Sequence, residues 1–302
     1  MNPTFELFLD PDPREAMLSR EFHEIIASSD LLELHTPNGT RLAGRSWEVP
    51  SRVKEVGAVL IVHGFGEHNC RYPHVARAFT EAGLRVVAFD LRGHGQSSGR
   101  RGHITHYREY LEDLDCIASH LRLNKGWLLF GHSLGAQILW HWLARNTYAV
   151  SGAILASPWF RLSKMPSRAK ILLAHALAGI APGMRQNTGG GNAHLSSDPS
   201  FLYALPGKPL SHRVMSTQMY LECSNAGRIA GQSAAAIQTP IWMPHGGSDW
   251  LTCADATLEI AASFTQVHQK AEILPNARHE LHNDAGREEY LRRATGWMLD
   301  RL

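Results

Sequence analysis

The sequence predicts an α/β fold, with a mostly parallel central sheet and helices on both faces. Two observations predict it. Short runs that are apolar throughout recur along the chain, and such runs are typical of strands buried on both faces of a sheet. Stretches with helical periodicity lie between them, which indicates parallel strands joined by crossover helices. With 302 residues, 44% hydrophobic and 19% charged, the chain is long enough to bury a large core.

The first expected element is an antiparallel hairpin. Extended runs at 31–34 and 41–47 flank residues 37–40 (PNGT), and Asn-Gly between extended runs is a hairpin signal. The buried strands are expected after this hairpin, at 58–62, 85–89, 127–130 and 152–156, with weaker candidates at 241–243 and 271–274.

Helical periodicity fills the intervals between these strands. Helices are expected at 74–81, 107–121 and 134–144, and at the C-terminal end through Tyr290 and Met298. Asn283 and Asp284 are the expected caps of that last helix. The stretch 134–144 is apolar nearly all round, which predicts a central, buried helix.

The alternation breaks between residues 158 and 238, where six prolines occur and no clear buried strand is present. We therefore expect residues 1–157 and 239–302 to form the core, and residues 158–238 to form a helical cap insertion over the sheet. The most apolar piece, 171–181, is too short to span a bilayer. We interpret it as a cap helix packed on the main domain, and a helix that touches a membrane is the alternative.

Composition excludes several classes of protein. The chain has 30 Lys and Arg against 28 Asp and Glu, a net charge of +2, so a nucleic-acid partner is not expected. The four cysteines form no CxxC pair, which excludes a zinc ribbon and indicates free thiols of a reducing compartment. Residues 1–22 lack a signal-peptide pattern, and no run of ~18 apolar residues occurs. We expect a soluble, cytoplasmic protein, and export by a leaderless route stays open.

The strongest chemical signal is residues 131–135 (GHSLG), directly after one buried strand and before a helix. This is the G-x-S-x-G nucleophile elbow in its strand–turn–helix context. The sharp turn strains the serine backbone, and the flanking glycines avoid clashes with neighbouring elements. Ser133 is therefore the expected nucleophile, and the N–H of Leu134, at the helix N-terminus, is an expected oxyanion donor.

A serine nucleophile needs a base, which in this type of fold follows an acid late in the chain. Eight histidines follow Ser133. His279 lies in the loop after the strand that ends at Leu274, at the carboxyl edge where the base belongs. His282, three residues further on, is its rival. We expect His279 to be the base.

The orienting acid is expected in the loop after the strand at 241–243. Asp249 lies there and would hold the imidazole in the required tautomer. Asp255 is the alternative, although we expect it to cap the following helix. The second oxyanion donor is expected in residues 63–68 (HGFGEH), after the strand at 58–62. We favour the N–H of Phe65, and a plain tight turn is the alternative.

Four motifs together resemble the monoacylglycerol lipase and lysophospholipase group of the α/β-hydrolases. They are residues 63–68 (HGFGEH), 90–99 (DLRGHGQSSG), 131–135 (GHSLG) and 278–283 (RHELHN). The resemblance extends from about residue 31 to the C-terminus. It implies an α/β-hydrolase fold with a cap between the sixth strand and the acid loop. It also implies a triad of Ser133, Asp249 and His279, with Phe65 and Leu134 as oxyanion donors.

The expected activity is hydrolysis of the carboxylic ester of a monoacyl lipid, a lysophospholipid or a monoacylglycerol, through an acyl-enzyme. No metal or organic cofactor is needed. An apolar cap suits a fatty acyl chain, and transient contact of the cap with a membrane surface is a further expectation. Residues 194–223 depart from any alignable pattern, so head group, chain length and oligomeric state stay open. A short-chain esterase, peptidase or carbon–carbon hydrolase, or a non-enzymatic ligand-binding protein, are the alternatives.

Overall fold

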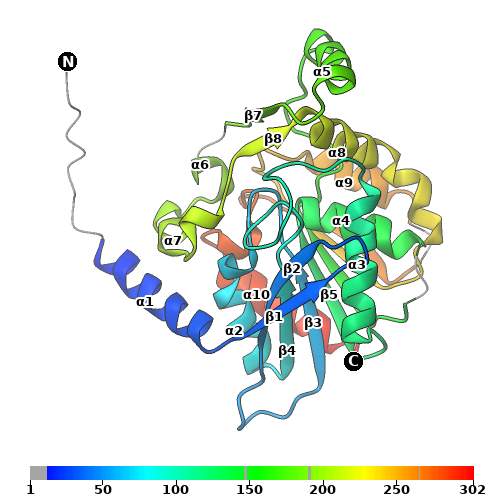
Figure 1. The fold of residues 1–302 in the computed structure, drawn as a ribbon. Coiled ribbons are helices and arrows are strands. Elements are labelled where there is room, and N and C mark those ends of the chain that lie inside the picture. The colour runs from blue at the N-terminus through cyan, green and yellow to red at the C-terminus, as the bar shows by residue number, and fades with distance from the viewer. Residues whose placement is uncertain (1–11, 146–147, 190–191, 265) are drawn as a thin grey trace, which may run out of the picture.

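A computed structural model of the chain describes residues 12–145, 148–189, 192–264 and 266–302 (Figure 1). The prediction that residues 1–22 contain no signal peptide falls partly on residues 1–11, which lie outside the described residues. The centre is an eight-stranded sheet with the order β1-β2-β4-β3-β5-β6-β9-β10. The strands are β1 (Asp30–His35), β2 (Arg41–Trp47), β3 (Gly57–Val62), β4 (Leu84–Phe89), β5 (Trp127–His132), β6 (Gly152–Ala156), β9 (Ile241–Gly246) and β10 (Gln269–Leu274).

The mostly parallel sheet and the hairpin are confirmed. β1 and β2 form an antiparallel pair, and β2 runs antiparallel to β4. The strands from β4 through β3, β5, β6 and β9 to β10 are parallel. The carboxyl ends of the parallel strands therefore meet at one edge of the sheet, where loops can gather functional side chains.

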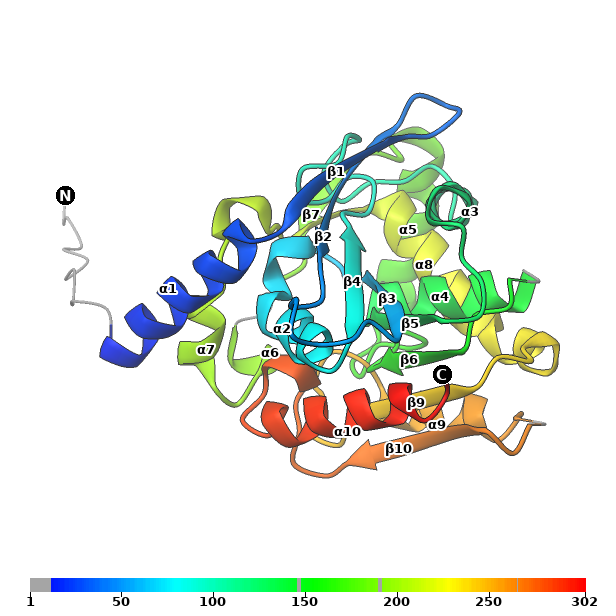
Figure 2. The same ribbon diagram turned by 90° about the horizontal axis from the view of Figure 1, so that it is seen from below.

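Helices cover both faces of the sheet, as predicted (Figure 2). They are α2 (Pro73–Glu81), α3 (Arg108–Leu121), α4 (Leu134–Arg145), α9 (Ala254–Ala261) and α10 (Arg287–Leu299). Successive residues of β3 alternate between the two apolar clusters, with Leu60 packed towards α3 and α4, and Ile61 packed towards α2 and α10. This alternation is the two-residue period of a strand buried on both faces.

Two predicted helix caps are wrong. Asn283 and Asp284 were the predicted caps of α10, but the N-cap residue is Gly286. The carboxylate of Asp284 instead accepts the backbone N–H groups of Arg278 and Ser197 at 2.6 Å each. α9 begins at Ala254, so Asp255 lies inside the first turn and cannot be its N-cap. In the first turn, the negative charge of Asp255 still interacts favourably with the positive end of the helix dipole.

The helix α1 (Pro13–Ala27) was not predicted from the sequence. It places Phe22 in a small apolar cluster with Phe201 and Leu202 of α7 (Pro199–Ala204). Its apolar stripe is narrow, and the partner of that stripe lies far away in the sequence. The helix therefore depends on a tertiary contact that local periodicity does not reveal.

Residues 158–238 contain further elements, including β7 (Arg185–Asn187) and β8 (Val214–Ser216), which pair with each other rather than with the central sheet. The remaining helices are α5 (Arg168–Ile180), α6 (Asn192–Leu195) and α8 (Thr217–Ile229). The division into core and cap at residues 158 and 238 stays a prediction.

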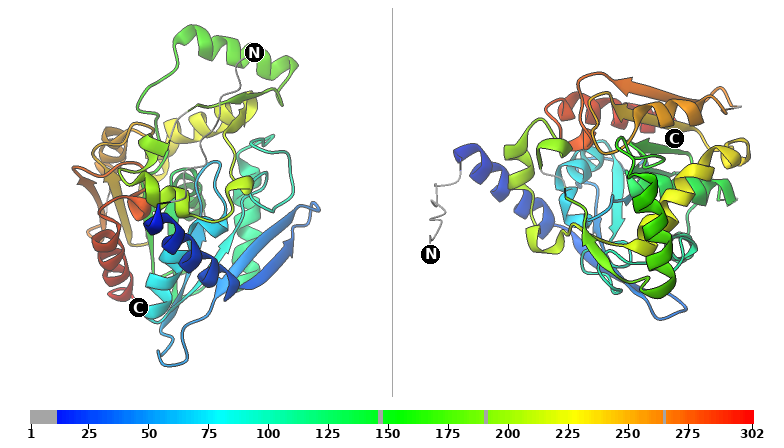
Figure 3. Two further views of the ribbon diagram at one scale, coloured as in Figure 1. Left: turned by 90° about the vertical axis from the view of Figure 1, so that its left-hand side faces the viewer. Right: turned by 90° about the horizontal axis from the view of Figure 1, so that it is seen from above.

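α5 occupies the apolar stretch where a cap helix was predicted, but it does not pack on the main domain. It contacts α8 of its own segment and has no buried residue. It stands off from the rest of the chain (Figures 1 and 3). No helix in the described part of the chain is long and apolar enough to cross a membrane.

Candidate active site

Ser133 lies at the sharp turn between β5 and α4, with a backbone φ of 53°. A side chain in this left-handed region is strained, and such strain persists only where neighbours fix the backbone. The N–H of Ser133 donates to the carbonyl of Ala156 at 2.9 Å. A Cβ at Gly131 would lie 2.8 Å from the Cα of Ala136, and one at Gly135 would lie 2.1 Å from the carbonyl oxygen of Val62. Both glycines are therefore sterically required for this turn.

Asp249 and His279 form a buried pair. Asp249 follows β9 and His279 follows β10, and Oδ2 of the acid lies 2.7 Å from Nδ1 of the imidazole. This contact leaves Nε2 of His279 as the nitrogen available to a serine hydroxyl. The ring of His279 lies 4.8 Å, centroid to centroid, from the ring of His132, which directly precedes Ser133. The two strand-end loops thus bring the acid–base pair to the elbow.

The pair shifts the pKa of each partner in the direction that a base and its orienting acid require. Burial alone would raise the pKa of the Asp249 carboxyl, but the neighbouring His279 and the hydrogen bonds from His245 and His279 hold it well below its ordinary value. Burial alone would lower the pKa of His279, but the charge and hydrogen bond of Asp249 raise it above its ordinary value. The acid therefore stays ionised and increases the basicity of the imidazole.

Asp249 has more partners than the sequence suggested. Its Oδ1 accepts the backbone N–H groups of Leu251 at 2.7 Å and Thr252 at 3.0 Å. Its Oδ2 accepts the hydroxyl of Thr252 at 2.7 Å and lies 3.2 Å from Nε2 of His245. The His–Asp spacing of four in a non-helical segment gives no signal that the two side chains meet.

His245 is oriented by a second contact. Its ring is fully buried, and its Nδ1 lies 2.7 Å from the hydroxyl of Thr257 in α9. The contact at Nδ1 fixes the ring so that Nε2, on its opposite side, faces Asp249. The carboxylate of Asp249 is thus held by two histidines, two backbone N–H groups and the hydroxyl of Thr252.

The loop at residues 63–68 is fixed from both sides. The N–H of Gly64 donates to Oε2 of Glu67 at 3.0 Å, and Nε2 of His63 accepts the N–H of Leu91 at 2.9 Å. From the opposite side, the N–H of His212 donates to the carbonyl of Gly66 at 3.0 Å. The loop that carries Phe65 is therefore held between the core and the segment that contains His212.

The two candidate oxyanion donors occupy the expected places. Leu134 is the first residue of α4, where N–H groups have no acceptor within the helix. The ring of Phe65 lies edge-on to the rings of His94 and His212, at centroid distances of 5.8 Å and 5.3 Å, and these two rings contact each other at 4.6 Å. Within the described chain, the N–H groups of Phe65 and Leu134 donate to no protein acceptor.

Glu67 links the loop at residues 63–68 to the elbow. Besides Gly64, it accepts the hydroxyl of Tyr72 at 2.5 Å, and its Oε1 lies 3.2 Å from Nδ1 of His132. Burial alone would raise the pKa of Glu67, but His132 and then Arg71 hold it well below its ordinary value. In the sequence, Glu67 and His132 were only members of the motifs at residues 63–68 and 131–135. Their contact could not be predicted, because it joins loops that lie far apart in the chain.

The alternative residues that the sequence left open lie elsewhere. His282 is fully buried and its ring stacks on Tyr72 at 4.9 Å, whereas the carboxylate of Asp249 contacts His279. Asp255 is exposed on α9. Among the residues that the structure describes, no group of three or more His, Cys, Asp or Glu side chains is arranged to hold a metal ion.

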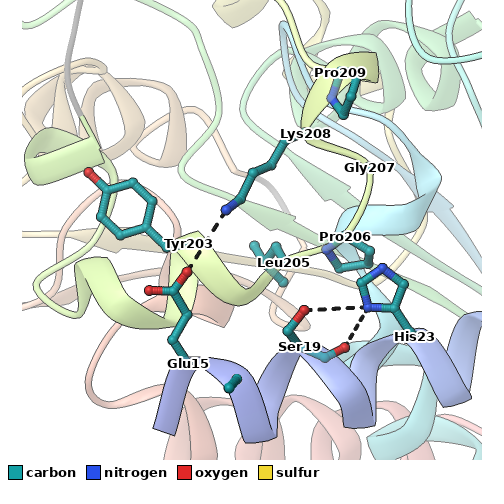
Figure 4. Close-up of a pocket in the computed structure, with 10 residues that line it drawn as sticks. Glu15, Ser19, His23, Tyr203, Leu205, Pro206, Gly207, Lys208 and Pro209 are labelled. Atoms are coloured by element: carbon teal, nitrogen blue, oxygen red, sulfur yellow. Dashed lines mark hydrogen bonds and ion pairs between the residues drawn. The ribbon is translucent and has the colours of Figure 1, made fainter. Parts of the chain in front are cut away.

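A cavity of about 380 Å³ lies away from these residues, between α1 and the segment after α7 (Figure 4). Its polar side chains are paired with one another. Nζ of Lys208 lies 3.9 Å from Oε1 of Glu15, and the ring of His23 contacts Ser19. None of the candidate site residues lines it. We therefore assign the cavity no part in the chemistry.

Comparison with known proteins gives consistent matches. The family described as "Serine aminopeptidase, S33" matches residues 54–286. A monoacylglycerol lipase of Mycolicibacterium smegmatis is 31% identical over 252 residues, which cover 82% of this chain and 89% of that protein. The solved structure of a Paleococcus ferrophilus monoacylglycerol lipase has a TM-score of 0.78 and 27% identity, and the match covers 86% of this chain and 99% of that one.

One relative is much longer than this chain. An uncharacterised abhydrolase domain-containing protein of Dictyostelium discoideum is 28% identical over 277 residues, and the match covers 91% of this chain but only 29% of that protein. This chain thus corresponds to one part of that relative.

Proposed function

From the premise that the chain is a carboxylic ester hydrolase and belongs to the monoacylglycerol lipase group of the α/β-hydrolases, we propose that its substrate is a monoacyl lipid. This lipid is either a lysophospholipid or a monoacylglycerol, and the chain hydrolyses its carboxylic ester. The observation that carries the proposal is the Asp249–His279 pair, at 2.7 Å, beside the strained elbow of Ser133. This arrangement supplies a nucleophile, a base and an orienting acid.

In the proposed mechanism, Oγ of Ser133 attacks the ester carbonyl while Nε2 of His279 accepts its proton. Asp249 stabilises the resulting imidazolium. The carbonyl oxygen becomes an oxyanion that accepts hydrogen bonds from the N–H groups of Phe65 and Leu134. The tetrahedral intermediate collapses, the C–O bond breaks, and His279 returns the proton to the leaving alcohol. Water, deprotonated by His279, then attacks the acyl-enzyme. The bond between the acyl carbon and Oγ of Ser133 breaks, His279 returns the proton to Oγ, and the fatty acid is released.

Support for an acyl-chain substrate comes from the apolar cluster that includes Leu134, the residue after Ser133. Met215 and Met219 of residues 158–238 belong to the same buried cluster, and Phe65 packs against it. An acyl chain that loses its contact with water at such a site gains roughly 0.8 kcal/mol per buried methylene. The proposed substrate therefore combines one apolar chain with one ester at Ser133.

A second part of the proposal concerns the place of the protein in the cell and its contact with membranes. Residues 158–238 act as a cap that touches a membrane surface transiently while the enzyme takes up or releases lipid. Its support is the unburied helix α5. We place the protein in the cytoplasm, since its four cysteines are free thiols.

The first experiment measures fatty acid release from a monoacylglycerol and a lysophosphatidylcholine of equal chain length. We expect Ser133→Ala to lower the turnover by ~10⁴-fold or more. Ser119→Ala, an exposed serine of α3, is the matched control and should keep the wild-type rate. The ratio of the two wild-type rates identifies the preferred head group.

Other products would redirect the assignment. Release of an amine from aminoacyl anilides, without fatty acid release, would replace the lipid substrate by a peptide. Full hydrolysis by Ser133→Ala would remove the nucleophile assignment itself.

A further inference from the structure

α1 lies outside the sheet, alongside α2 and α7 (Figures 1 and 2). One face of α1 carries Leu18, Phe22 and Ile25, at the i, i+4 and i+7 positions of a helix. Phe22 is 1% exposed, and its ring contacts Phe201 of α7 at 5.2 Å and His74 of α2 at 5.6 Å, centroid to centroid. The side chain of Phe22 therefore fills the space between α2 and α7.

Both ends of α1 are fixed by hydrogen bonds. At the end nearer the sheet, Nε1 of Trp47 in β2 donates to the carbonyl of Ile25 at 3.0 Å. At the other end, Nη2 of Arg14 donates to Oδ2 of Asp198, the N-cap residue of α7, at 2.8 Å. α1 is thus anchored to the central sheet and contacts α7 along its length.

α7 packs mainly on α1. Phe201, Leu202 and Ala204 of α7 belong to an apolar cluster that is separate from the two clusters at the sheet. Among the described residues, Phe22 is the one buried member of this cluster that comes from outside residues 158–238. A large part of what holds α7 in place is therefore the side chain of Phe22.

The chain before α7 is bonded to the loop that carries His279. The N–H of Glu280, the next residue, donates to the carbonyl of Leu195 at 2.8 Å. The hydroxyl of Ser196 donates to the carbonyl of Asn283 at 2.9 Å. A displacement of α7 would therefore reach the backbone next to the proposed base.

The chain after α7 is bonded to the loop that carries Phe65. The N–H of His212 donates to the carbonyl of Gly66 at 3.0 Å. Gly207 packs so closely on the ring of His68 that a Cβ at Gly207 would lie 2.4 Å from Cε1 of that ring. α7 thus lies between two short segments, one of which contacts the loop of the base and the other the loop of the proposed oxyanion donor.

We propose that Phe22 is a positioning residue for ester hydrolysis. By holding α7 against α2, it keeps the two flanks of α7 on the loops of His279 and Phe65, so that the base and the oxyanion donor keep the geometry that the reaction requires. This inference rests on the proposed function and adds to it a residue outside the catalytic loops. Phe22 acts through other residues and is not itself part of the triad.

The first test measures kcat and KM for a soluble short-chain ester, p-nitrophenyl butyrate. We expect Phe22→Ala to lower kcat about tenfold, because misplaced catalytic groups slow the chemical step. KM should stay within about twofold of the wild-type value, since the variant leaves the residues around the ester unchanged. Phe22→Leu keeps most of the side-chain volume and should restore at least about half of the wild-type kcat.

Two controls separate positioning from stability. Leu84→Ala removes a fully buried side chain at the amino end of β4, at the opposite edge of the sheet from the site, and should lower the melting temperature without lowering kcat. Met17→Ala shortens a side chain of α1 that is 63% exposed and should change neither. If Phe22→Ala does not fold, Leu18→Ala truncates a half-buried member of the same cluster and should lower kcat about two- to threefold.

Hydrogen exchange gives a readout that does not depend on activity. The N–H groups of Glu280 and His212 should exchange about tenfold faster in Phe22→Ala than in the wild type, because their bonds across the segments open more often. The N–H groups of β5 should change much less, since they lie in the centre of the sheet.

The outcomes distinguish this inference from the proposed function. A wild-type kcat for Phe22→Ala would overturn the inference, whatever the exchange rates, and would leave the proposed function intact. An equal loss of kcat in Leu84→Ala would also overturn it, because the loss would then follow stability. If the wild type hydrolyses no ester, the proposed function fails, and faster exchange at Glu280 and His212 would still show that Phe22 positions the two loops.

Discussion

The central strands and α5 have similarly apolar sequences but use them in opposite ways. In β5, Leu128, Leu129 and Phe130 are completely buried, and neighbouring strands satisfy their backbone groups. In α5, Leu172 is 70% exposed and no residue is buried. The same residue types thus stabilise the fold in one region and remain free for a partner in the other. Hydrophobicity alone therefore does not distinguish a core element from a contact surface.

The largest expected effect lies at the sheet edge, where Asp249→Asn should reduce kcat/KM by about 10⁴-fold. The neutral amide cannot stabilise the imidazolium of His279. The pKa of His279 should also fall, so the acid limb of the remaining activity should shift to lower pH. Asp255→Asn, an exposed aspartate on α9, is the control. Similar rates for Asp249→Asn and the wild type on a soluble ester would show that another residue is the acid.

The comparison is tested directly by one substitution made in both regions. Leu129→Ala removes a fully buried side chain of β5 and should lower the free energy of unfolding by ~2–5 kcal/mol. Leu172→Ala on α5 should change it by less than ~0.5 kcal/mol. Denaturation by urea measures both. Comparable losses would mean that α5 is buried in solution.

Glycines provide a finer version of the same test. Gly135→Ala should lower the free energy of unfolding by ~1–3 kcal/mol, because the new Cβ would lie 2.1 Å from the carbonyl oxygen of Val62. Gly179→Ala on α5 meets no atom within 4 Å and should raise it by ~0.4–1 kcal/mol. Thermal melts of the two variants should therefore move in opposite directions. A shared direction would contradict the contrast between the two regions.

The smallest effect concerns His245. His245→Leu removes a donor from Asp249, so the carboxylate interacts more strongly with His279 and raises the pKa of His279 further. Because the base must be neutral to accept the serine proton, the acid limb of kcat/KM should move to higher pH, and the maximal rate should fall about tenfold. His245→Gln keeps a donor at the position of Nε2 and should restore most of the rate. A pH profile unchanged by His245→Leu would limit His245 to a packing role.

The sequence predicted those parts of the molecule whose signals are local. The buried strands β3, β5 and β6 each contain a continuous apolar run, and the elbow at Ser133 is a short motif whose glycines are required by nearby backbone. The features that were missed depend on contacts between distant segments. α1 needs α7, and Asp284 caps no helix because Ser197 and Arg278 occupy its carboxylate.

The candidate site shows the same division. Asp249 and His279 followed from their places after successive strands, and the structure brings them together. The additional partners of Asp249 and of the loop at residues 63–68 could not be predicted, because no spacing rule relates His245 to Asp249 or Glu67 to His132. Side-chain contacts of this kind are set by how loops pack at the sheet edge.

The hydrogen bond between His212 and Gly66 connects residues 158–238 directly to the loop at residues 63–68. A Cβ at Gly66 would lie only 2.2 Å from the carbonyl oxygen of His212, so the two backbones touch with no side chain between them. The two segments therefore cannot move independently at this point, which is next to the N–H of Phe65. If that N–H stabilises the oxyanion as proposed, we expect the rate of acylation to depend on the position of residues 158–238.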